Sequence, residues 1–169
     1  MYSFRMSERW QQDEDSDGEF DQLTAINPND IRIAAMDLLA RREHSRRELK
    51  QKLLKRFKAD DLIETQLDRL IEDNLQSDAR YAESFLRQRM NRGHGPMRIR
   101  QEMRQKGISD SEIALAMEEE APDWFALAEA TYQRKFGALP PEDIKEKAKR
   151  SRFMQYRGYA LDHYQHLFD

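Results

Sequence analysis

The chain has 169 residues, of which 29 are Lys or Arg, 32 are Asp or Glu, 4 are His and none is Cys. Charged residues make up 36% of the sequence, against roughly 25% in an ordinary globular domain, and apolar residues make up 38%. The lack of Cys excludes a disulfide scaffold, a Cys-ligated zinc site and a thiol nucleophile. No apolar run is long enough for a membrane span and no signal-peptide pattern is present, so we expect a soluble cytoplasmic protein.

The first region, residues 1–29, is expected to be a flexible, disordered acidic segment. Residues 1–30 contain 8 acidic and 2 basic side chains, and one hypothesis is that they lie on the protein's own basic surface as a weak electrostatic brake. The stretch Asp13–Gly18 resembles the start of an EF-hand loop. Position twelve of that loop is Thr24 instead of the required Glu, so calcium binding is not expected.

Residues 30–75 are expected to form the first of three helical repeats. Apolar residues recur at helical spacing over residues 31–39, 49–54 and 62–71, and no segment has the alternation of a strand. Asn29 or Asp30 is the candidate N-cap of the first helix. For the second helix, Ser45 and Glu48 have the spacing of a capping box, and Asp60 or Asp61 is expected to open the third.

The same plan recurs in residues 76–120 and 121–169. Arg56, Lys106 and Arg157 are spaced by 50 and 51 residues, with apolar residues at matching positions before and after each. The sequence therefore predicts an all-α fold of three tandem three-helix repeats, stacked into an elongated, curved body because each repeat is too small to bury a core alone.

The third repeat is expected to contain helices over residues 122–136, from Pro141 or Glu142 to Tyr156, and over 159–168. Four of its aromatic residues are predicted to form core. They are Trp124, Phe125, Phe136 and Phe153.

Basic and acidic blocks alternate along the chain. Residues 41–58, 86–107 and 145–157 hold 9, 7 and 6 basic side chains, largely on the second helix of each repeat, whereas residues 59–74 and 108–123 each hold 6 acidic ones. Two interpretations remain open: basic and acidic helices neutralise one another, or a basic face is left for a polyanion or an acidic protein surface. The excess of basic residues favours the second.

The candidate binding residues are basic side chains of the three second helices. Few aromatic residues lie among them, so we expect contacts with the phosphates of single-stranded or double-stranded DNA and no reading of base sequence. The candidates are Arg46, Arg47, Lys50, Lys52, Lys55, Arg98, Arg100, Arg104, Lys106, Arg150, Arg152 and Arg157.

Other motifs have simpler explanations. Gly93–Pro96 contains Gly-x-Gly, but no strand precedes it, so a turn between helices is expected and a nucleotide site is not. Tyr156–Tyr159 is expected to end a helix, with Arg157 as a possible contact. His163 and His166 have the spacing of two metal ligands but lack a third. No catalytic residue, metal or cofactor is expected.

Three segments carry a resemblance to a known family. They are Leu38–Leu49, Gly93–Ile108 and Arg152–Tyr159, and the second matches the pattern Gly-Pro-x-Arg-Ile-Arg-x-Glu-Leu-x-x-Lys-Gly-Ile with Met103 in place of Leu. In this order they are similar to the RecX regulators of the RecA recombinase, over residues 30–169.

The resemblance implies a crescent that binds in the groove of the RecA–DNA filament without catalysing a reaction. Such proteins act in DNA repair, recombination and the SOS response, and they limit filament growth, ATP hydrolysis, strand exchange and co-protease activity. Two alternatives remain: a stand-alone DNA-binding module without sequence specificity, and a structural adaptor. A monomer is expected, because no exposed heptad pattern is apparent. No membrane partner is expected, because no apolar run is long enough for a membrane span.

Overall fold

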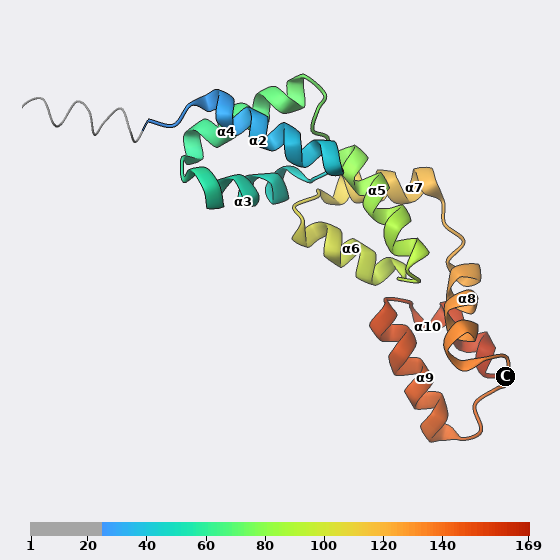
Figure 1. Cartoon of the computed structure of the whole chain (residues 1–169). Helices are drawn as coiled ribbons and strands as arrows, with labels where there is room; N and C mark the ends of the chain where they lie inside the picture. The colour runs from blue at the N-terminus through green and yellow to red at the C-terminus, as the bar shows by residue number, and fades with distance from the viewer. Residues whose placement is uncertain (1–24) are drawn as a thin grey trace, which may run out of the picture.

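The computed structural model describes residues 25–169, and all of the regular secondary structure in this part of the chain is helical (Figure 1). The expected acidic brake and the EF-hand-like stretch lie outside the described residues. The helices form three groups of three along the chain. They are α2 (Pro28–Arg41), α3 (Arg46–Phe57) and α4 (Asp60–Glu72) in unit one; α5 (Asp78–Asn91), α6 (Pro96–Gln105) and α7 (Asp110–Glu120) in unit two; and α8 (Trp124–Phe136), α9 (Ile144–Arg157) and α10 (Leu161–Tyr164) with the 3₁₀ turn η1 (Gln165–Phe168) in unit three.

Short polar side chains fix most helix starts. Ser45, Ser77 and Ser109 accept hydrogen bonds from backbone N–H groups of α3, α5 and α7, which otherwise have no partner within the helix. The first helix starts earlier than predicted, because Asn27, and not Asn29 or Asp30, is its N-cap and Pro28 occupies its first position. Residues 28–29, expected to be disordered, are therefore helical.

Unit three differs most from the sequence expectations. The helix expected from Pro141 or Glu142 begins at Ile144, because the Asp143 side chain accepts a hydrogen bond from the Glu146 N–H at 2.8 Å. The final helix begins at Leu161 and tightens into a 3₁₀ turn. This unit is consequently the least regular of the three.

Each unit encloses its own apolar core, contrary to the expectation that one unit is too small to do so. The core of unit one is built around Leu49, Ile63 and Leu67, and all three side chains are fully buried. The core of unit two contains Ile99 and Met103, which are also fully buried. The units therefore do not depend on broad apolar contacts with one another.

The aromatic residues of unit three form its core, with one exception. Trp124 packs against the cores of both units two and three, and Phe136 and Phe153 pack against the core of unit three. Phe125 was predicted to be core but is 54% exposed, because it lies in the first turn of α8, where its ring contacts the edge formed by His163 and His166.

The three units follow one another in an elongated, bent arrangement (Figure 1). The all-α, curved architecture predicted from the repeats is therefore confirmed. None of the helices in residues 25–169 is both long and apolar enough to cross a membrane.

Candidate functional site

The second helix of each unit lies on the inner side of the bend. In Figure 1, α3, α6 and α9 follow one another along the lower left side of the molecule, while the remaining helices lie above them or to their right. The basic blocks of the sequence are largely on these three helices. The inner face, defined as the exposed surface of α3, α6 and α9, is therefore a single continuous candidate surface.

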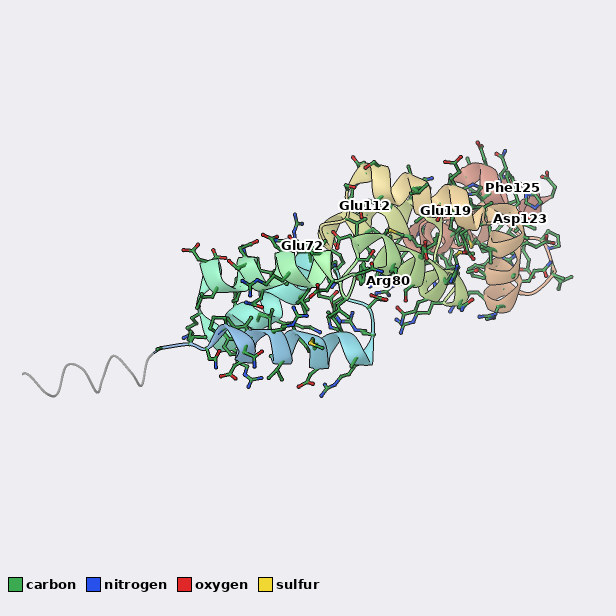
Figure 2. All side chains as sticks on the ribbon, turned by 90° about the horizontal axis from the view of Figure 1, so that it is seen from above. Glu72, Arg80, Glu112, Glu119, Asp123 and Phe125 are labelled. Carbon is green, nitrogen blue, oxygen red and sulfur yellow. The ribbon has the colours of Figure 1, made fainter. Side chains whose placement is uncertain are left out.

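The outer side of the molecule carries acidic residues. Figure 2 shows Glu72 on α4, Glu112 and Glu119 on α7, and Asp123 at the start of α8 in succession from unit one to unit three. These carboxylates form a row of negative charge along this side, which disfavours binding of an anionic partner there.

The joint between units two and three is made by backbone groups. The N–H of Gly95 donates to the carbonyl of Arg157 at 2.7 Å, and the N–H of Met97 donates to the carbonyl of Gly158 at 3.0 Å. Free N–H groups at the start of α6 are thus paired with free carbonyls at the end of α9. The arrangement also brings the positive end of the α6 dipole beside the negative end of the α9 dipole, which is favourable.

This close approach requires glycine on both sides. A Cβ on Gly95 would lie 2.5 Å from the Gly158 carbonyl carbon and oxygen, and one on Gly158 would lie 2.4 Å from the Arg98 Cβ. Gly158 also has a φ of 100°, which only glycine adopts readily. The Gly93–Pro96 turn and the helix stop at Tyr156–Tyr159, two separate motifs in the sequence, are therefore the two halves of one joint.

The joint between units one and two uses side chains. Asp78, the first residue of α5, accepts hydrogen bonds from the Arg46 N–H at 2.8 Å and from the Gln76 side-chain amide at 3.0 Å. The same amide donates to the His44 carbonyl at 3.1 Å, and Arg80 pairs with Glu43 at 3.0 Å. A carboxylate from unit two thus satisfies the start of α3.

Arg47 completes this joint in the way that Arg98 completes the other. Its guanidinium reaches the carbonyls of Arg104 and Gln105 at 3.4 and 3.5 Å, at the end of α6. A Cβ on Gly107 would lie 2.9 Å from the Arg47 Cβ. At the other joint, Arg98 approaches the Tyr156 carbonyl at 3.4 Å. Both arginines were candidate binding residues, and the structure places both at joints.

Buried ionisable groups lie beside each joint. Glu48 is 6% exposed and pairs with Arg42. Burial tends to raise the pKa of Glu48, but the hydrogen bond and charge of Arg42 outweigh it and lower the pKa. Burial lowers the pKa of His44, which lies 3.0 Å from the Lys52 amine, and lowers the pKa of His94 to about 4 with help from Arg98.

The other basic candidates of unit one divide into paired and free residues. Arg46 pairs with Glu64 and Asp68, and Lys50 pairs with Asp60 and Glu64, so acids of α4 in the same unit neutralise both. Lys52 lies 3.8 Å from Glu48. Lys55 is exposed and forms no ion pair within residues 25–169.

In unit two the free candidate is Arg100. It is exposed and forms no ion pair in the described part of the chain, whereas Arg104 pairs with Asp110 at 2.9 Å across an exposed surface. Lys106 is half-buried, and its charge contributes to lowering the pKa of Glu48.

In unit three Arg150 is 7% exposed and therefore lies in the interior. It donates hydrogen bonds to the Tyr132 hydroxyl at 2.9 Å and to the Leu139 carbonyl at 2.7 Å. Arg157 donates to the Arg92 carbonyl at 3.1 Å across the joint. Arg152 is exposed and makes no ion pair among the described residues.

A groove that the sequence did not predict lies where α6 meets α9 and α10. Its volume is about 1110 Å³, and Met97, Tyr156 and Leu161 line it together with Arg100 and Arg104. The apolar residues come from two units that only the joint brings together, so no local pattern could have revealed the groove.

The two histidines with metal-ligand spacing pack against an aromatic ring. Phe125 lies 5.2 Å from the ring of His163 and 6.4 Å from that of His166, centroid to centroid. Residues 25–169 contain no group of three or more His, Cys, Asp or Glu side chains placed to hold a metal ion.

Comparisons with known proteins match each unit separately. The models of the first, second and third three-helix domains of RecX match residues 32–70, 77–117 and 122–166. The chain is also similar in fold to two crystal structures, that of a regulatory protein RecX (TM-score 0.70, 24% identity, covering 83% of this chain and 72% of that one) and that of RecX from Lactobacillus salivarius (TM-score 0.66, 24% identity, covering 83% and 93%).

Curated relatives are more similar in sequence. The regulatory protein RecX of Ectopseudomonas mendocina (strain ymp) is 50% identical over 136 residues, which are 80% of this chain and 91% of that protein. That of Pseudomonas entomophila (strain L48) is 48% identical over 135 residues, covering 80% and 87%. With all three domains matched in order and half of the aligned residues identical, this chain belongs to the RecX family of regulatory proteins.

Proposed function

We propose that this chain is a non-enzymatic regulator of a RecA recombinase that binds in the groove of the RecA–DNA filament through its inner face. Membership of a family of regulatory proteins supports a regulatory role in general. Binding there would limit filament growth, and with it ATP hydrolysis, strand exchange and co-protease activity.

The observation that carries the proposal is the alignment of α3, α6 and α9 on one side of a bent molecule. The two joints hold these helices in a row, so one surface can contact several subunits of a helical filament in succession. Lys55, Arg100 and Arg152, one on each helix, remain exposed and without an ion pair in the part of the chain that the structure describes. The acidic outer side disfavours the opposite orientation.

The paired basic residues favour a protein surface over DNA as the main contact. Arg46, Lys50 and Arg104 already have acidic partners, and Arg150 is buried, so the free positive charge is much smaller than the sequence count. A stand-alone DNA-binding module would need more phosphate contacts for comparable affinity.

The test is the single-strand-dependent ATPase of RecA, titrated with this protein. Wild type should inhibit well below one copy per RecA subunit, because a capped or disassembled filament loses many active subunits. Inhibition that appears only when the DNA is saturated would support competition for DNA, and no effect would support an adaptor.

The matched variants reverse three charges each. Lys55→Glu, Arg100→Glu and Arg152→Glu together should abolish most of the inhibition while circular dichroism remains helical. The control combines Arg41→Glu, Arg69→Glu and Arg134→Glu, which reverse three exposed arginines outside the middle helices. Equal inhibition by both triple variants would contradict docking through the inner face.

A further inference from the structure

We propose that the groove between α6 and α9–α10 binds an apolar side chain projecting from an acidic segment of the partner protein. This rests on the proposed function, since the partner is the recombinase, and it identifies where on the inner face a specific anchor is held. The groove is defined by Met97, Arg100 and Arg104 of unit two with Tyr156 and Leu161 of unit three.

Three of the residues that line the groove are large, apolar and exposed. Met97 is 59% exposed, Tyr156 73% and Leu161 49%, and all three side chains line the same hollow. Single exposed apolar residues are ordinary, but a gathering in a concavity is typical of a binding surface. Tyr and Met are enriched in the centres of protein interfaces.

The polar groups around the groove select a negative partner. Arg100 has no acidic partner within residues 25–169, and Arg104 is held only by the exposed Asp110. Glu102 is the one acid among the lining residues, and it is already paired with Arg98 at 2.9 Å and Arg89 at 3.3 Å. The net charge that faces an incoming segment is therefore positive, which favours carboxylates beside the apolar anchor.

The shape of the lining favours a protein segment over single-stranded DNA. Bases bind on the flat faces of aromatic rings, whereas two of the three exposed apolar residues here are Met97 and Leu161, and the second tyrosine of the lining, Tyr159, is buried. The guanidinium of Arg98 lies 5.1 Å from the centre of the Tyr156 ring and occupies one of its faces. Flexible aliphatic side chains beside one tyrosine instead fit an aliphatic or aromatic protein side chain.

The groove exists only while the joint between units two and three is closed. The Gly95–Arg157 and Met97–Gly158 backbone bonds hold α6 against the end of α9, with Tyr156 and Leu161 on the far wall. A partner that binds only this closed arrangement must stabilise the joint in turn. Anchoring at the groove would thereby stiffen the crescent along the filament.

The affinity experiment uses the full chain with a fluorescent label. Binding is measured to RecA filaments on oligo-dT and, separately, to oligo-dT alone. Tyr156→Ala and Met97→Ala should each weaken filament binding about tenfold, as for anchor residues at an interface centre, and leave binding to oligo-dT unchanged. Leu115→Ala, which removes a 50%-exposed leucine on α7, is the control and should bind like wild type.

The outcomes separate the two proposals. If wild type fails to bind the filament, the proposed function is wrong. If wild type binds and Tyr156→Ala binds equally well, the groove is not the anchor site although the function stands. If the loss is confined to oligo-dT, the groove is a nucleic-acid site and the proposal is overturned.

Crosslinking identifies the occupant directly. A photo-reactive benzoylphenylalanine in place of Leu161 should crosslink to a recombinase peptide that contains an apolar residue flanked by Asp or Glu. A crosslink to residues 1–24 of this chain, to a second copy, to DNA or to a basic recombinase peptide would refute the proposal.

Discussion

The two joints place successive units in a similar way with different chemistry. At the start of α3, the side chains of Ser45 and Asp78 accept the free backbone N–H groups. At the start of α6, the cap is Gly95, which has no side chain to offer, and backbone carbonyls of α9 accept them instead. Both joints place a glycine beside an incoming arginine, Gly107 beside Arg47 and Gly158 beside Arg98. They differ at the start of the docked helix, which polar and charged side chains cap at the first joint and backbone groups cap at the second.

Two joints with similar geometry are therefore weakened by different kinds of substitution. A joint built on carboxylates and arginines is weakened by neutralising a charge. A joint built on apposed glycines tolerates changes of charge but not an added methyl group, because the two backbones are already in contact.

The largest effect is expected for Gly158→Ala. The added methyl group meets Arg98, and the positive φ adds strain, so we expect a loss of about 2 to 4 kcal/mol in the free energy of unfolding. Urea denaturation measures the loss of stability, and small-angle scattering should show that units two and three have moved apart.

Two other glycines separate the causes of that loss. Gly95→Ala adds only the steric clash, since Gly95 has a φ of −91°. Gly137→Ala adds only strain, since its Cβ would meet nothing within 4 Å. If only Gly137→Ala matched the loss of Gly158→Ala, strain and not docking would explain the need for glycine.

The second effect is a loss of stability in mild acid. In the unfolded chain His94 takes up a proton once the pH falls below its ordinary pKa of 6.5. In the folded protein the pKa of His94 is lowered to about 4, so His94 stays neutral between these two pH values. Unfolding therefore takes up protons, and stability should fall by about 2 to 3 kcal/mol between pH 6.5 and 4. The lowered pKa of His44 acts in the same direction.

Unfolding midpoints in urea across this pH range provide the measurement. His94→Gln should flatten the pH dependence whatever it does to stability at pH 7. His166→Gln, which changes an exposed histidine, should retain the wild-type slope. A slope that survives the loss of both His94 and His44 would contradict this assignment.

The smallest effect concerns the charged joint. Glu48→Gln should cost about 1 to 3 kcal/mol at pH 7, because it leaves Arg42 and Lys52 near a buried neutral amide. Glu43→Gln, which weakens a half-exposed pair with Arg80, should cost about 0 to 1 kcal/mol. If Glu48→Gln and Glu43→Gln lost equal stability in thermal unfolding, burial of Glu48 would not explain the cost of its substitution.

The helices were predictable because their signals are local. Ser45 lies where the helical periodicity of the second helix begins, and the structure confirms it as a cap. Ser77 and Ser109 cap α5 and α7 in the same way. The repeat also predicts that the basic blocks lie on equivalent helices of the three units, but it does not predict that these helices follow the inner side of the bend. Core membership was less certain at the ends of helices, where Phe125 is exposed although its neighbour Trp124 is packed.

The joints were not predictable because their partners are far apart in sequence. The Gly95–Arg157 bond spans two units, and nothing near either residue indicates the other. The burial of Arg150 does have a local signal, because Arg150 lies four residues before the buried Met154 and therefore on the same face of α9. Counting basic residues by block does not distinguish such a residue from an exposed one.

Lys58 marks the end of the row of middle helices that forms no joint within residues 25–169. It follows α3 in the left-handed conformation, with a φ of 48°, at the place where Gly107 and Gly158 follow α6 and α9. The two glycines lie against an arginine from the preceding unit, whereas Lys58 carries an exposed side chain at the equivalent place. The kind of joint used inside the molecule, which needs a bare backbone at the end of a middle helix, is therefore absent at the end of α3 in the described part of the chain.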